Sequence, residues 1–546
     1  MRRTSSRLVA VAAATALGLT ACSGSDEGPE KSELTESEVV ESTEPGTEPV
    51  DSLVWGLPTG EPTSVDPIVA GANSEMTMVG NLCESLLNLN PDFSVSAGVA
   101  TSAEWADDTT FVIDLRDDVT FWDGSALTAD DVVYSLERTA NPEGPSYYGG
   151  AFRYVTSIKK TGPLQVTVTF GQPDAQFRNA LAGPAGNVVQ AAFATEAAEA
   201  FGTADGGLMC TGPFELVEWT TGDSIEVKAY PGYWDGEPLV KQITFRFVAD
   251  AATLTTALRS GEIDGAYNLP VSTAVALGKS DSGTVYRGPS TESLSFGPTS
   301  AEGPAADPRV REALNLAIDK KALISSVLRG LGTIQKTFTA PLAWSGDPAV
   351  DIYQAGYDAL PANDSPDLER AKQLVEEAGV GDTTLVMAIP AGGSTESQAA
   401  TAVQAAAKEI GIDLELKTLQ PTEFSELFYN PEKRADVDFV CTIGYQEVPG
   451  SLYYAPEFAT PTGLYNWSMY DVPEVTALLE EARASTDPAV TAEKFVQAQE
   501  IFAPDNLQIT LAGVNTLLYL RDGLSGAPAS IAYISSPWAL HLGGTA

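Results

Sequence analysis

The order of elements between residues 385 and 416 limits the fold of this chain more than any other feature. Apolar residues at 385–389 predict a strand, residues 396–410 a helix, and residues 412–416 a second strand. Two strands joined by a crossover of this length lie parallel, with a right-handed connection. This unit indicates the α/β class, in which ligands bind in crevices between lobes or at strand ends.

The rest of the chain alternates between strands and helices in the same way, without heptads or short repeats. A strand is predicted at 53–57, and a hairpin at 158–170, where apolar residues alternate around a turn. Helices are predicted where a capping residue precedes apolar residues at helical spacing. They begin after Thr128, with Asp131 completing a capping box, after Asp307, and at Ser365-Pro366, and the last of them ends at Gly379.

Charge limits the partners of the chain. Its 546 residues include 31 lysines and arginines against 74 aspartates and glutamates, a formal net charge of −43. The phosphates of nucleic acids and of anionic lipids would be repelled, so we expect neither as a partner. At roughly 100 to 200 residues per domain, the length predicts two or three lobes.

Histidine is almost absent, which argues against most enzymes. The single imidazole, His541, lies near the C-terminus, so histidine-dependent triads and histidine metal sites lack their ligands. Neither a G-x-S-x-G nor a C-x-x-C motif occurs. We therefore expect no enzyme, no cofactor and no metal site. A secreted hydrolase that uses paired carboxylates remains an alternative, because acids are plentiful.

The first 50 residues are typical of an export signal and a linker. Three arginines precede an apolar run at 8–19, which is too short to span a bilayer and fits the core of a signal peptide. Leu-Thr-Ala-Cys then resembles a bacterial lipobox, so residues 1–21 would be removed and Cys22 would carry the lipid. Nine acids and no aromatic residue follow, which predicts a disordered tether over 22–50. An ordinary secretory signal is the alternative, and the choice between Sec and twin-arginine export stays open.

Five motifs resemble, in order along the chain, those of one protein family. They are LRDDVTFWDGSALTADDVVYS at 115–135, TGPF at 211–214, YWDG at 233–236, ALRSGEID at 257–264 and VREALNLAID at 310–319. Each is common alone, but their order is specific. From about residue 52 onward, the chain resembles the bacterial extracellular solute-binding proteins of family 5, the oligopeptide, dipeptide and nickel receptors of ABC importers.

The resemblance implies a two-lobed type II periplasmic-binding-protein fold with an extra subdomain in lobe I. Lobe I would comprise 51–88, 206–288 and 509–546, the inserted subdomain 89–205, and lobe II 289–508. A solute in the cleft would contact both lobes and so stabilise their closed arrangement.

The function that the resemblance implies is that of a substrate-binding lipoprotein. It would capture a peptide or peptide-like solute and deliver it to the permease and ATPase subunits of an ABC importer. We expect a monomer on the extracytoplasmic face of the cell membrane, held there through its lipid anchor only. A receptor for a non-peptide organic solute or a metal chelate, with the same fold, stays open as the alternative.

The cysteine count predicts one disulfide. If Cys22 is lipidated, three thiols remain, which indicates one pair and one leftover thiol. Cys441 lies in an apolar strand, where a buried free cysteine is typical. The resemblance places Cys83 and Cys210 in the same lobe and thereby implies that these two pair.

The resemblance also indicates where the solute would bind. Peptide binders of the family carry an acid after a Gly-Trp pair, and the matching stretch at 444–450 is GYQEVPG. Here Tyr445 replaces the tryptophan, and Glu447 is the one acid. We expect Glu447 to meet a cationic end of the solute, with Tyr445 and Trp467 as apolar walls. Further candidates are Asn466, Trp344 and Tyr453. Packing between lobes is the alternative for the aromatic residues, and a solvated loop rim for Glu447.

Lipidation of Cys22 makes the first testable prediction. In Triton X-114 extracts of expressing bacteria, the wild-type protein should enter the detergent phase, because an acyl chain binds the micelle. The Cys22→Ser variant should stay in the aqueous phase. Equal partitioning of the two proteins would show that Cys22 carries no lipid.

Overall fold

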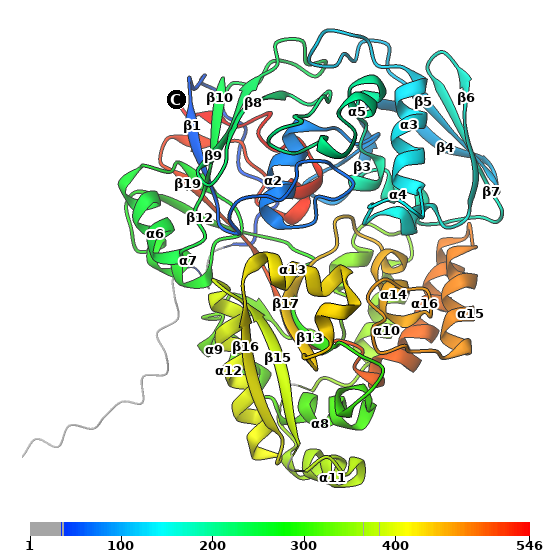
Figure 1. The fold of residues 1–546 in the computed structure, drawn as a ribbon, viewed down its shortest axis with the longest axis vertical. Helices are drawn as coiled ribbons and strands as arrows, with labels where there is room; N and C mark the ends of the chain where they lie inside the picture. The colour runs from blue at the N-terminus through cyan, green and yellow to red at the C-terminus, as the bar shows by residue number, and fades with distance from the viewer. Residues whose placement is uncertain (1–33, 35–37, 364, 382) are drawn as a thin grey trace, which may run out of the picture.

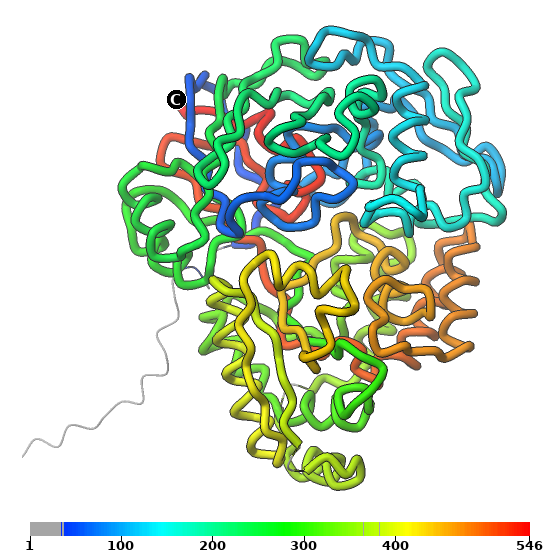
Figure 2. The backbone as a smooth tube through the Cα atoms, viewed as in Figure 1, coloured from blue at the N-terminus to red at the C-terminus, as the bar shows by residue number. Residues whose placement is uncertain are grey.

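Two β-sheets organise the computed structural model, which describes residue 34 and residues 38–363, 365–381 and 383–546. The seven-stranded sheet forms lobe I, the upper body in Figure 1, and the six-stranded sheet forms lobe II below it. The first strand and the C-terminal segments, blue and red in Figure 2, lie together in lobe I. The chain thus leaves lobe I and returns to it, as a two-lobed α/β fold requires.

Lobe I is built on a mixed sheet. Strand β1 lies inside it, parallel to both of its neighbours, and the remaining pairs are antiparallel. Helices α2 (Asn73–Leu82), α6 (Ala251–Ser260) and α7 (Val271–Leu277) accompany this sheet. In order across the sheet, the strands are β12 (Gly283–Gly288), β19 (Thr516–Arg521), β11 (Gly265–Ala266), β1 (Leu53–Leu57), β10 (Gln242–Phe247), β9 (Ser224–Ala229) and β8 (Phe214–Thr220).

The inserted subdomain is a four-stranded antiparallel sheet with one main helix, at the upper right of Figure 1. The predicted hairpin is present as β6 and β7. Helix α3 (Ala129–Ala140) begins at the predicted cap, where the Thr128 amide and hydroxyl both donate to Asp131 Oδ2. The sheet order is β4 (Ala100–Asp107), β5 (Thr110–Leu115), β7 (Gln165–Phe170) and β6 (Val155–Gly162), and the short elements are β2 (Leu87–Leu89), β3 (Val95–Ala97), α4 (Phe177–Ala180) and α5 (Ala191–Ala197).

Lobe II contains the strand, helix, strand unit that the sequence predicts. Strand β15 lies parallel to β16 in register, with Thr384 opposite Asp413, and α12 connects them. The sheet order is β14 (Gly332–Thr333), β18 (Ile509–Val514), β13 (Ser293–Pro298), β17 (Phe439–Gly444), β15 (Thr384–Pro390) and β16 (Asp413–Leu419). The helices are α8 (Pro308–Ala317), α9 (Lys320–Ser326), α10 (Val350–Ala359), α11 (Leu368–Ala378), α12 (Ser394–Glu409), α13 (Pro421–Tyr429), α14 (Ser451–Ala459), α15 (Pro473–Arg483) and α16 (Pro488–Phe502).

Carboxylate caps set the starts of two lobe II helices. The Asp307 carboxylate accepts the Arg309 amide at the start of α8, as predicted. Helix α11 begins two residues later than the predicted Ser365-Pro366, because the Asp367 carboxylate accepts the Arg370 amide at 3.0 Å. Gly379 ends this helix in the left-handed conformation, where a residue without Cβ fits best.

The chain passes between the lobes at two neighbouring places. One crossing, residues 289–292, joins β12 to β13, and the other, Asn515, joins β18 to β19. The Val514 amide donates to the Glu292 carbonyl at 3.1 Å, so the two crossings are hydrogen-bonded to each other. Strand β18 belongs to the sheet of lobe II, so the return to lobe I lies at Asn515 rather than at the predicted residue 509.

Residues 38–50 lie against lobe I, so the prediction of a disordered tether up to residue 50 is wrong for this stretch. The Val40 amide donates to the Arg287 carbonyl at 2.8 Å, and the Thr43 amide to the Ala527 carbonyl at 3.0 Å. Backbone partners from distant parts of lobe I thus order a segment whose own composition favours disorder.

The predicted signal peptide, residues 1–21, and Cys22 lie outside the described residues. Within the part of the chain that the structure does describe, no helix combines the length and the apolar character needed to cross a bilayer.

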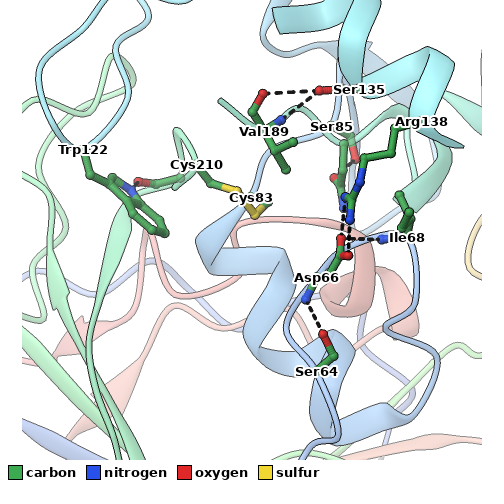
Figure 3. Close-up of a disulfide and its surroundings, with 12 residues drawn as sticks. Ser64, Asp66, Ile68, Cys83, Ser85, Trp122, Ser135, Arg138, Val189 and Cys210 are labelled. Carbon is green, nitrogen blue, oxygen red and sulfur yellow. Dashed lines mark hydrogen bonds and ion pairs between the residues drawn. A yellow bond between two sulfur atoms is a disulfide. The ribbon is translucent and has the colours of Figure 1, made fainter. Parts of the chain in front are cut away.

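A disulfide and a partly buried ion pair join the first segment of lobe I to later parts of the chain (Figure 3). Cys83, which ends α2, is bonded to Cys210, with their Cα atoms 5.0 Å apart; these are the two cysteines whose pairing the resemblance implies. Asp66 pairs with Arg138 on α3, and its Oδ1 accepts Arg138 Nη1 at 2.8 Å. Cys441 is a free, buried cysteine. The disulfide thus joins the two lobe I segments on either side of the inserted subdomain, and the ion pair joins the subdomain itself to lobe I.

Glu84 is a buried acid inside lobe I. Its side chain is 2% exposed, and its Oε1 accepts the Tyr233 hydroxyl at 2.9 Å and the Trp234 indole at 2.8 Å. The Arg116 guanidinium lies 3.9 Å over the Trp234 ring. Burial raises the pKa of the Glu84 carboxyl to about 7, against the effect of these hydrogen bonds. Tyr233 and Trp234 are therefore packing residues of lobe I.

The variant Glu84→Gln should make stability less dependent on pH. The folded state binds the Glu84 proton more tightly than the unfolded state, so the stability present at low pH is lost as pH rises from about 4.5 through about 7. A pKa shift of this size corresponds to about 3 kcal/mol in the free energy of unfolding. Urea unfolding at about pH 5 and about pH 8 should show a smaller loss for Glu84→Gln, which keeps an acceptor for Tyr233 and Trp234. Equal losses in variant and wild type would contradict this assignment.

Candidate functional site

Lobe II contacts lobe I through the segment that follows β17. The Tyr445 hydroxyl donates to the Gly71 carbonyl at 2.6 Å, and the Ser535 hydroxyl donates to the Glu447 carbonyl at 3.0 Å. Gly71 precedes α2, and Ser535 ends a short 3-10 helix of lobe I. The structure therefore brings two of the sequence-predicted site residues, Tyr445 and Glu447, to the boundary between the lobes.

The Glu447 carboxylate lies at this boundary without a cation. Its residue is half-buried, and none of the ion pairs within the described residues involves it. Burial raises the pKa of the Glu447 carboxyl to about 7, opposed by its own backbone amide and by the Tyr453 hydroxyl. A carboxylate that is partly desolvated and has no ion-pair partner is stabilised when a cation binds beside it.

Phenol groups, rather than charges, surround Glu447. Burial, followed by the negative charge of Glu447, raises the pKa of Tyr453 and of Tyr148 well above the usual tyrosine range. Burial and the same charge raise the pKa of Tyr454. These hydroxyls therefore stay protonated at neutral pH and act as hydrogen-bond donors or acceptors without adding charge. Tyr453, one of the predicted residues, lies beside Glu447.

A row of aromatic rings crosses from lobe II to the inserted subdomain. Tyr429, at the end of α13, stacks on Tyr147 with centroids 4.1 Å apart and planes 4° apart. Phe428 contacts Tyr429 on one side and Trp467 on the other, at centroid distances of 6.3 and 5.6 Å. The Arg434 guanidinium lies 4.5 Å over the Trp467 ring. Trp467 thus belongs to the lobe II end of this row, and its ring contacts within the described residues do not include Tyr445.

A buried ion pair joins the inserted subdomain to lobe II. Arg483, the last residue of α15, binds Asp174 through two hydrogen bonds of 2.8 Å, from Nε to Oδ1 and from Nη2 to Oδ2. The Arg483 side chain is 5% exposed and the Asp174 side chain 0%. The more exposed pair Arg153–Glu457, at 3.0 Å, connects the same two bodies. These contacts hold the lobes together without involving Glu447.

Two sequence-predicted site residues have structural roles instead. Trp344 is 2% exposed and stacks on Tyr353 at 5.5 Å inside the helical core of lobe II, so it does not line the boundary. Asn466 is 6% exposed, and its side chain closes its own loop. Its Nδ2 donates to the carbonyls of Thr460 and Tyr470, and its Oδ1 accepts the Tyr470 amide, which leaves little capacity for a solute. Neither side chain is therefore placed to contact a solute at the boundary between the lobes.

Sequence reasoning missed several residues at the boundary. Glu292 lies in the first crossing. The sequence could have indicated it, because an acid stands there directly before an apolar strand. Tyr147 and Tyr148 form an aromatic pair within a polar loop, a second signal. Asp174 and Arg483 carry no local signal, because 309 residues separate them.

The boundary between the lobes offers the Glu447 carboxylate, ring surfaces and neutral hydroxyls. In the described part of the chain, no three His, Cys, Asp or Glu side chains are grouped in a way that could hold a metal. Glu447 can accept hydrogen bonds from an ammonium group, while Tyr445, Tyr453 and Tyr429 offer ring surface and neutral hydroxyls.

The chain is similar in sequence to known solute-binding proteins. The family model described as bacterial extracellular solute-binding proteins, family 5, matches residues 94–466. The glutathione-binding protein GsiB of Pectobacterium atrosepticum is 29% identical over 460 residues, which cover 82% of this chain and 86% of that protein.

Solved structures share the fold. The oligopeptide-binding protein AppA from Bacillus subtilis, in complex with a nonapeptide, superposes with a TM-score of 0.80 at 20% identity and covers 92% of this chain and 100% of its own. AgaA from A. tumefaciens R10, in complex with agropinic acid, gives a TM-score of 0.80 at 23% identity, over 91% of this chain and 99% of its own. At these identities, the likeness establishes the two-lobed fold.

Proposed function

Because the chain belongs to the bacterial extracellular solute-binding proteins of family 5, we propose that it is the substrate-binding lipoprotein of an ABC importer. In this proposal it captures a peptide or peptide-like solute between its lobes and delivers it to the permease and ATPase subunits. The curated relative GsiB, named as a glutathione-binding protein, and the nonapeptide complex of AppA support a peptide-like solute.

One observation carries the peptide assignment: the unpaired Glu447 carboxylate at the boundary between the lobes. An amino terminus or another amine would supply the missing positive charge. Closure of lobe I over the segment that contains Glu447 and Tyr445 would bury such a charge pair, so solute binding and closure would be coupled. The hydroxyls of Tyr445 and Tyr453 would flank the ammonium group.

Anchoring and location complete the proposal. Cys22, once lipidated, would hold the protein on the extracytoplasmic face of the cell membrane, and residues 38–50 would lead from the anchor into lobe I. The solute would be enclosed by the two lobes of one chain, which suits a monomer. The alternative is a receptor for a non-peptide solute or a metal chelate, with the same fold. Among the described residues, no contact argues specifically for it.

The variant Glu447→Gln should weaken binding of the native solute. That solute is first identified by native mass spectrometry of the purified protein, and its affinity is then measured by isothermal titration calorimetry. Loss of one partner of a buried charge pair costs about 2 to 5 kcal/mol, which corresponds to a loss of affinity of about 30-fold or more. As a matched control, Glu493→Gln on the exposed side of α16 should bind within about threefold of wild type.

Three outcomes separate the parts of the proposal. Unchanged affinity in Glu447→Gln, or a solute without an amine, would remove the role of Glu447 and leave the receptor function intact. Steady conversion of the solute in proportion to protein concentration would instead favour an enzyme and contradict the receptor function.

A further inference from the structure

Glu292 is a second acid at the boundary between the lobes. It lies in the first crossing, directly before β13, and its side chain is 3% exposed. Its Oε2 accepts the Ser290 hydroxyl at 2.9 Å, and its Oε1 accepts Asn73 Nδ2 of lobe I at the long distance of 3.4 Å. No ion pair among the described residues involves Glu292. The carboxylate is therefore poorly compensated for its burial.

Neighbouring groups add no positive charge. Burial raises the pKa of the Glu292 carboxyl to about 7, and the nearby Glu396 carboxylate raises it further, against the hydrogen bonds from Ser290 and Asn73. Burial also raises the pKa of Glu396 itself. A closed structure with two such acids and no cation is electrostatically unfavourable unless a ligand supplies the charge.

Buried polar side chains provide an independent indication of a ligand. The Tyr533 hydroxyl is fully buried with Thr77 as its hydrogen-bonding neighbour, and its ring is fixed by stacking on Tyr267 at 3.8 Å. Burial, followed by the charge of Glu292, raises the pKa of Tyr533, which places the two groups near each other. Gln446 is 1% exposed, and neither its Nε2 nor its Oε1 has a partner.

The register of lobe II places Glu292, directly before β13, beside the segment that contains Tyr445 and Glu447. Ser293 lies opposite Gly444 in the β13–β17 pair. Beyond the last pair, the Thr291 hydroxyl donates to the Gln446 carbonyl at 2.9 Å. The same hydroxyl accepts a hydrogen bond from the Gln446 amide at 3.1 Å. Glu292 therefore lies across from Tyr445, and Glu447 follows Tyr445 by two residues in the chain.

We propose that Glu292 is a second cation-binding position, and that the solute carries a second ammonium or guanidinium group in addition to the amine that meets Glu447. This inference rests on the proposed function and narrows the solute class to short basic peptides or similar dications. The Tyr533 hydroxyl and the Gln446 side chain would supply hydrogen bonds to the polar part of the solute near this position. Asn73, from lobe I, would place the Glu292 carboxylate when the lobes close.

Matched tripeptides test the second position. Alanine tripeptides with lysine at each position in turn are compared with the same peptides containing norleucine, which has the same chain length without the ammonium group. The protein is first freed of bound solute by dialysis in denaturant and refolding. Calorimetry should show that wild type binds at least one lysine peptide about tenfold or more tightly than its norleucine partner.

Three variants separate the roles of the acids. Glu292→Gln, which keeps the acceptor for Ser290 and Asn73, should lose the preference for lysine over norleucine. Glu447→Gln should weaken binding of both members of the pair by similar factors and keep the preference. Glu493→Gln should behave as wild type. Circular dichroism and thermal unfolding check that Glu292→Gln is folded.

Several results would overturn the inference. Glu292→Gln could keep the preference for lysine over norleucine, or the wild-type protein could bind both peptides equally well. Either result would leave Glu292 with a structural role in the hinge alone. If wild type binds none of the tripeptides, the solute found by native mass spectrometry decides: one with fewer than two cationic groups overturns the second position, while its binding still supports a receptor. A solute with two cationic groups, bound less tightly by Glu292→Gln, supports it.

Discussion

The hydrogen bond from the Val514 amide to the Glu292 carbonyl ties together the two places where the chain passes between its lobes. Because both crossings lie side by side, the lobes are joined along one edge and can separate along the opposite one. Contacts that join the lobes elsewhere, such as Asp174–Arg483, would break if the lobes separated.

Closure is governed by two opposing sets of contacts. The Asp174–Arg483 ion pair, the Tyr147–Tyr429 stack and the hydrogen bond from Tyr445 to Gly71 favour the closed form without a solute. The unpaired carboxylates of Glu292 and Glu447 oppose it, because closure removes them from water.

In the proposed function, a cationic solute would remove this opposition and leave the favourable contacts in place. The equilibrium between open and closed forms then shifts by as much as the solute prefers the closed form. In this account, the sign and spacing of the charges at the boundary determine which solute binds. The remaining contacts between the lobes stabilise the closed form for any solute that neutralises these charges.

Much of the fold follows from local sequence signals. The alternation of apolar residues, the Thr128–Asp131 capping box and the β15–α12–β16 unit depend on neighbours within a few residues, and the structure contains all three. The position of the second crossing, Asn515, could not be predicted from the sequence. The apolar residues on either side of it form an almost continuous run, which does not show where one strand ends and the next begins. Order in residues 38–50 depends on distant backbone partners that composition does not show.

The site was predictable only where the resemblance aligned a motif. Tyr445 and Glu447 were found in this way, and both lie at the boundary. Trp344 was misassigned because a loop tryptophan carries no local sign of whether its ring enters a helical core. The Asp174–Arg483 pair joins segments 309 residues apart, so it depends on tertiary structure alone.

Small-angle X-ray scattering on the Cys22→Ser protein tests the account most directly. Scattering is recorded after bound solute has been removed and again after saturation with the solute identified by mass spectrometry. The account predicts that the radius of gyration falls on saturation and that the closed curve matches the structure described here. Identical curves with and without saturating solute would contradict the claim that the solute's positive charge closes the lobes.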